Sequence, residues 1–172
     1  LCSFCTSGTP ITPYGDELDL TGYSLVFEDE FEGDNIDWNI WRHRGVGKKA
    51  YYVATGDQTE VKDGNLYLTA EYRDGEHGKN WYAASIALKE RYTYGYFEVR
   101  CILPAATGMW SAFWMMNGDV TNVDGSGKDG TEVDVFESFY YKDHWWGNDA
   151  ISTGIHYDGY DERTHHGEAV GK

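Results

Sequence analysis

Three acidic residues lie close together in the segment TEVDVFES, residues 131–138, and they are the strongest candidates for chemistry in this chain. They are Glu132, Asp134 and Glu137. Two carboxyl groups in different surroundings can divide their roles, one staying ionised as a nucleophile while the other donates a proton. This is the division of labour that hydrolysis of a glycosidic bond requires.

The apolar residues between the acids predict a β-strand, and the strand period sets which acids can meet. Successive side chains of a strand point to opposite faces, so Glu132 and Asp134 share a face and Glu137 points away. A β-bulge near Val135 and Phe136 would add one residue and return Glu137 to the face of the other two. Bulges are common beside active sites, so we expect one here.

Distance limits what the pair can do. Ignoring the bulged residue, Glu132 and Glu137 are four strand steps apart, roughly 13 Å between Cα atoms at ~3.3 Å per step. A retaining glycosidase holds its two carboxyls about 5–5.5 Å apart, which long side chains on a concave sheet can reach. Between them, Asp134 is expected to bond to a neighbouring carboxyl and help keep one of them protonated.

Two simpler interpretations of the acids stay open at this point. Glu132 and Asp134 would also occupy the solvated face of an ordinary amphipathic strand, with Glu137 at its end. Clustered carboxylates also suit a Ca²⁺ site, because hard cations prefer oxygen ligands.

Aromatic residues make up 16% of the chain, with 7 Trp and 14 Tyr, and several lie near the acids in the sequence. Trp110 and Trp114 are four apart in MWSAFWMM, hence on one face of a predicted strand. Aromatic rings pack on the C–H faces of sugars, so both are candidates for substrate binding, with core packing as the alternative. Trp145 and Trp146 form an adjacent pair in a predicted loop and are candidates for a sugar platform.

Composition excludes several classes of partner. The formal net charge of -15 disfavours nucleic acid and anionic membranes, since both attract basic surfaces. No run of 18 apolar residues predicts a transmembrane helix, and no leading signal segment is visible. Cys2 and Cys5 lack the further ligands of a zinc site, which leaves a disulfide between them open. Cys101 is expected to be a small buried side chain.

Short alternating segments separated by turn signals predict an all-β sandwich or jelly roll without long helices. Residues 1–22 are expected to form a tail or leading loop, and residues 23–172 one domain. No closing strand is predicted in the polar end THHGEAVGK. The predicted strands span residues 23–31, 63–72, two segments within 82–104, 109–116, 131–141 and 151–160.

Several motifs together resemble family 16 of the glycoside hydrolases, the laminarinase, lichenase and agarase-like enzymes. GMWSAFWMM followed by GTEVDVFES matches the pattern G-x-W-x-A-x-W and the bulged motif E-x-D-x-x-E. LVFEDEF, DGNLYLTA, YTYGYFEVRCILP and GIHYDGY support the match, which runs over residues 23–160. The resemblance implies that Glu132 is the nucleophile, Glu137 the general acid and then base, and Asp134 their assistant. It also implies that His156 lies near the catalytic strand.

The resemblance further implies a concanavalin-like β-jelly-roll sandwich, which would be incomplete in this chain because the family fold needs more strands than 172 residues provide. We therefore expect a second polypeptide or a C-terminal fragment to complete it. The implied activity is retaining endo-hydrolysis of a β-1,3- or mixed-linkage β-1,3-1,4-glucan by a secreted enzyme without a cofactor. A galactan substrate, a lectin-like module without chemistry and a Ca²⁺-dependent adhesion domain are the alternatives, and some family members hold a structural Ca²⁺.

Overall fold

The structure is a computed structural model that describes residues 19–49, 51–140, 151–161 and 166–171. The chain divides into two compact units, Leu1–Cys101 and Ile102–Lys172. The described elements are β-strands apart from one 3₁₀ turn, η1, so the predicted all-β class is confirmed. None of the helical structure in the described ranges is long and apolar enough to cross a membrane.

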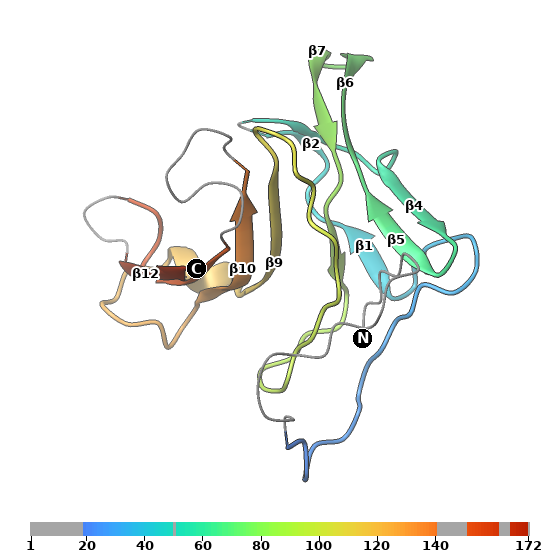
Figure 1. The fold of residues 1–172 in the computed structure, drawn as a ribbon. Coiled ribbons are helices and arrows are strands. Elements are labelled where there is room, and N and C mark those ends of the chain that lie inside the picture. The colour runs from blue at the N-terminus through green and yellow to red at the C-terminus, as the bar shows by residue number, and fades with distance from the viewer. Residues whose placement is uncertain (1–18, 50, 141–150, 162–165, 172) are drawn as a thin grey trace. The chain divides into compact units, whose positions relative to one another are not determined.

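The first unit contains short strands arranged in small sheets (Figure 1). Strands β1 and β8 pair, β4 and β5 form a hairpin, and a third sheet has the order β2-β3-β7-β6. Asp63 and Gly64 both have positive φ, which suits the tight turn between β4 and β5 that the sequence predicts. The bounds are β1 Trp41–His43, β2 Gly47–Lys48, β3 Val53–Ala54, β4 Thr59–Lys62, β5 Asn65–Leu68, β6 Ala70–Gly75, β7 Gly78–Ala83 and β8 Ile86–Leu88.

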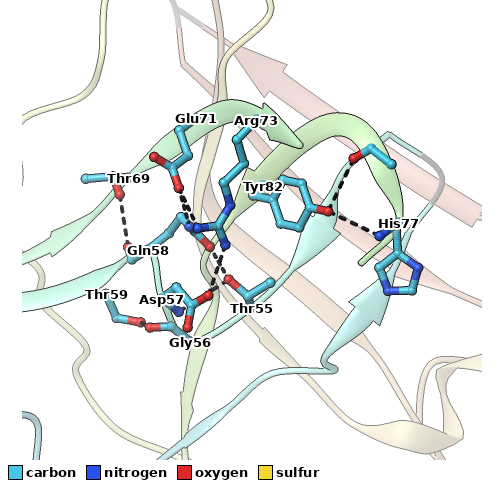
Figure 2. Close-up of polar contacts among 11 residues, drawn as sticks. Thr55, Gly56, Asp57, Gln58, Thr59, Thr69, Glu71, Arg73, His77 and Tyr82 are labelled. Carbon is cyan, nitrogen blue, oxygen red and sulfur yellow. Dashed lines mark hydrogen bonds and ion pairs between the residues drawn. The ribbon is translucent and has the colours of Figure 1, made fainter. Parts of the chain in front are cut away.

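An apolar cluster and a polar network hold this unit together. Arg73 on β6 contacts Asp57 at 2.9 Å and Glu71 at 3.1 Å, and its guanidinium lies 4.6 Å from the centre of the Tyr82 ring (Figure 2). Buried Gln58 donates to Glu71, which fixes the loop before β4 against β6. The buried apolar cluster comprises Phe31, Ile36, Val61 and Leu66, with Trp41 and Ile86 packed against it.

The second unit forms one antiparallel sheet with the order β12-β11-β10-β9. The central strand β10 carries the three acids and lies beside β9, as Figure 1 shows. The turn η1 lies between β9 and β10 in the chain. The bounds are β9 Trp110–Met116, η1 Gly118–Thr121, β10 Glu132–Phe139, β11 Ser152–Tyr157 and β12 His166–Gly171.

Several predicted elements differ from the structure. The predicted strand 63–72 is divided into β5 and β6, which belong to different sheets. Residues 23–31 form no ladder with any described residue, and Leu25 and Val26 are exposed, because an alternating segment becomes a strand only when a partner lies beside it. Residues 96–104, the second of the two strands predicted within 82–104, also form no ladder with any described residue. Conversely, the polar end of the chain does contain a strand, β12, because β11 offers it an edge to pair with.

Candidate active site

A β-bulge at Val135 interrupts the pairing of β10 with β9. Asp134 pairs with Trp114, and Phe136 pairs with Phe113. The two partners are neighbours on β9, whereas one residue separates Asp134 from Phe136 on β10. Val135 is therefore the extra residue. The pairing of β10 with β11 shifts at the same place. The bulge predicted from the spacing of the acids is confirmed at the predicted position.

The bulge brings Glu132, Asp134 and Glu137 to one face of the sheet. Because every second residue of a regular strand shares a face, the partners of the acids show which way the acids point. Their partners on β9 are Met116, Trp114 and Ala112. Their partners on β11 are His156, Gly154 and Ser152. Both sets advance in steps of two, so all three acids lie on the same face.

Asp134 is the most buried of the three, with 4% of its surface exposed. Its Oδ2 lies 3.1 Å from Nε2 of His156. Burial raises the pKa of Asp134, the charge of Glu132 raises it further, and His156 opposes both effects. The sequence predicted a bond to a neighbouring carboxyl. The register instead places His156 opposite Glu132, where an imidazole can meet Asp134 without bringing two acids into contact.

Glu137 is held by Trp110, whose indole Nε1 donates to Oε1 at 2.8 Å. Burial raises the pKa of Glu137, the Trp110 hydrogen bond lowers it, and the charges of Asp134 and Glu132 raise it. The net direction is upward. A carboxyl group with a raised pKa is suited to donate a proton near neutral pH.

Glu132 accepts a hydrogen bond from the hydroxyl of Tyr160, 2.5 Å from its Oε2. The sequence interpretation assigned no role to Tyr160. Its only signal was the Asp-Gly pair in HYDGY, which marks a turn directly after a strand. That Tyr160 reaches back to Glu132 is a tertiary fact that no local pattern contains.

The predicted aromatic residues have different outcomes. Trp110 is 56% exposed and its ring centre lies 4.5 Å from that of Phe139. Trp114 lies opposite Asp134 and is half-buried. Both belong to the face that carries the acids. Trp145 and Trp146 lie outside the described residues, as do Cys2 and Cys5.

One group of possible metal-binding atoms lies in this site. Glu132, Asp134 and His156 each offer an atom within 4.8 Å of the others. One of the three is an imidazole nitrogen, whereas Ca²⁺ takes oxygen ligands, so the set does not fit the Ca²⁺ alternative. An imidazole placed to donate to a buried carboxylate explains the same geometry without an ion.

Comparisons with known proteins identify the family of this chain. The model of glycosyl hydrolases family 16 matches residues 46–171. A beta-glucanase from Rhodothermus marinus is 30% identical over 125 residues, which cover 67% of this chain and 43% of that protein. Glucan endo-1,3-beta-glucosidase A1 from Niallia circulans is 27% identical over 153 residues, covering 76% of this chain and 21% of that protein.

A solved structure shows the same fold. Porphyranase B from Zobellia galactanivorans has a TM-score of 0.62 at 22% identity, over 83% of this chain and 58% of that one. The likeness supports the predicted β-jelly roll, of which this chain contains a part. The chain spans less than half the length of the two glucanase relatives above. Since the family model matches most of its residues, the chain belongs to the glycosyl hydrolases family 16.

Proposed function

We propose that the chain is the catalytic part of a retaining endo-glycosidase that cuts internal bonds of a β-1,3- or mixed-linkage β-1,3-1,4-glucan. The observation that carries the proposal is the common face of Glu132, Asp134 and Glu137, created by the bulge at Val135. An ordinary solvated strand has no need of a bulge that gathers its acids. The names of the two relatives, both glucan hydrolases, support the substrate class.

In the first step a carboxylate oxygen of Glu132 bonds to the anomeric carbon, and the bond from that carbon to the leaving sugar oxygen breaks. Glu137 gives its proton to that oxygen. In the second step water attacks the anomeric carbon, Glu137 takes a proton from the water, and the bond to Glu132 breaks. One water is consumed for each linkage cut, and both glutamates return to their starting forms.

The surroundings of the two glutamates support these roles. Burial raises the pKa of Glu137, as a proton donor requires. Asp134 adds negative charge that raises the pKa of Glu137 further, and His156 holds Asp134 in place. Trp110 and Trp114, on the same face, are proposed to pack against sugar rings.

Reducing-sugar release from a panel of β-glucans and galactans tests the activity. We expect release from a β-1,3- or mixed-linkage glucan and loss of about 10⁴-fold or more in Glu132→Gln and Glu137→Gln. NMR of the first product should show the β-anomer, the sign of retention. Release only from a galactan would support the alternative substrate. A folded protein that binds glucan but cuts nothing would support the lectin-like alternative, and loss of function on chelation alone would support the adhesion domain.

We also propose that a second chain or a C-terminal fragment completes the sandwich, and that the protein is secreted to meet its polymer substrate. This chain covers only 58% of the porphyranase chain, and residues 23–31 have strand character without a described partner. Light scattering of the purified protein should give a mass above 19.5 kDa. A stable 19.5 kDa monomer would contradict the proposal.

A further inference from the structure

The hydroxyl of Tyr160 lies against the proposed nucleophile, and the proposed reaction does not use it. The hydroxyl donates to Oε2 of Glu132. Tyr160 itself lies three positions beyond the end of β11. Its side chain is half exposed, with 52% of the residue surface accessible. A core-packing role therefore does not explain its position.

A sharp turn after β11 places this tyrosine. Asp158 and Gly159 both have positive φ, 60° and 77°, a conformation that residues other than glycine rarely adopt. Two consecutive left-handed residues reverse the chain direction within a short distance. The residue that follows them can therefore turn back toward the strand face that carries His156, opposite Glu132.

Hydrogen bonds to the loop between β9 and β10 hold the turn in place. Asp158 is buried, and its Oδ1 accepts from the backbone N–H groups of Asp124 and Gly125 at 2.9 and 3.1 Å. The backbone N–H of Gly159 donates to the carbonyl of Val120 at 2.7 Å. A buried carboxylate that accepts two backbone N–H groups is a strong anchor. Tyr160 is thus presented to Glu132 from a fixed turn.

We propose that Tyr160 is a positioning residue for Glu132, an inference that rests on the proposed function. The phenol holds Oε2 and so fixes the plane of the carboxylate, leaving Oε1 to bond to the anomeric carbon. Hydrogen bonds to an ionised acceptor are about twice as strong as those between neutral groups. The Tyr160 bond therefore strengthens when Glu132 leaves as a carboxylate, and it assists the second step of the reaction most.

This role predicts a specific kinetic signature for Tyr160→Phe. A dinitrophenyl glycoside of a short β-1,3-glucan has a good leaving group, so the first step is fast and turnover reports the second step. We expect kcat to fall about tenfold, the loss of one hydrogen bond to a charged group. KM should fall with it, because the glycosyl-enzyme accumulates. Intact-protein mass spectrometry during turnover should show the added glycosyl mass on the variant.

Matched variants separate this role from a structural one. Tyr96→Phe removes a similar bond, from a tyrosine hydroxyl to Glu98 at 3.0 Å, in the first unit, and should leave kcat within about twofold of wild type. Tyr160→Gln retains an N–H donor and should recover part of the loss. Thermal melting of Tyr160→Phe should match wild type, since the ring stays and the side chain is half exposed.

Each outcome decides the inference. Unchanged kcat in Tyr160→Phe, with Glu132→Gln inactive, would overturn it and leave the proposed function intact. A lower melting temperature, with kcat reduced but no glycosyl-enzyme, would mean that Tyr160 acts only on folding. A wild-type protein that releases nothing from any glycoside would overturn the proposed function and this inference together.

Discussion

Deletion of Val135 tests the register on which the site depends. Asp134 and Phe136 face Trp114 and Phe113, which are neighbours on β9, so removing the residue between them leaves the rest of the ladder in place. In the shortened strand the original Glu132, Asp134 and Glu137 would follow one another in steps of two. We therefore expect the three acids to stay on one face.

Deletion of Val133 is the matched control, because it removes the same type of residue from the same strand, also half-buried. It would move Glu132 to the place of Val133, opposite Met115, and hence to the other face of the sheet. The proposed nucleophile would then point away from Asp134 and Glu137.

The magnitudes separate the two deletions. Losing a half-buried valine costs roughly 1 kcal/mol of folding free energy in either variant. Loss of the bulge straightens β10 and shifts Glu137, and a displacement of about 1 Å costs about 100-fold in rate. Deletion of Val135 should therefore retain activity within about 100-fold of wild type. Deletion of Val133 should lose about 10⁴-fold or more, as Glu132→Gln does.

The assay is reducing-sugar release from the glucan that wild type cuts, with thermal melting to confirm that both deletion variants fold. A folded variant lacking Val135 that is as inactive as the variant lacking Val133 would refute the reasoning. The bulge would then do more than place the three acids on one face of the sheet.

Two further substitutions test the electrostatics of the site. Trp110→Phe removes the donor that lowers the pKa of Glu137, so the basic limb of the pH–rate profile should move to higher pH, with kcat changed about two- to tenfold. The control is Trp81→Phe, because Trp81 is also a half-exposed tryptophan beside an aromatic ring. A basic limb that does not move in Trp110→Phe would contradict the assignment of Glu137 as the acid. Asp134→Asn should raise the unfolding temperature by a few degrees at neutral pH, because burial raises the pKa of Asp134 in the folded state and its ionised form is therefore destabilising. Wild type becomes more stable as pH falls through the raised pKa, so calorimetry should show a smaller difference in unfolding temperature between Asp134→Asn and wild type in acid. A difference that grows in acid would contradict the direction of the pKa shift.

The bulge could be predicted from the sequence because the strand period and the acidic motif place Glu137 on opposite faces. The period of a strand places Glu137 out of phase, and the motif needs it in phase, so one extra residue resolves both. The strands β9, β10 and β11 were predicted on the same local basis, from alternation and flanking turn residues.

The contacts that adjust the acids could not be predicted. The bonds from Trp110 to Glu137 and from Tyr160 to Glu132 join residues 27 and 28 positions apart, and local periodicity carries no information over such distances. Strand β12 was missed for a related reason, since its sequence is polar and only the free edge of β11 makes it a strand. Residues 23–31 show the converse, a strand-like sequence without a described partner.

The position of β10 within its sheet has a consequence for motion. A strand flanked on both sides has its amides shielded by two ladders, so exchange of β10 amide hydrogens for deuterium should be among the slowest in this unit. The acids are therefore carried by backbone that opens only when the whole sheet opens. The hydroxyl of Tyr160 reaches Glu132 from a turn outside the ladders, so rotation of this one side chain would release Glu132 without opening the sheet, and it would slow the reaction only as much as Tyr160→Phe does.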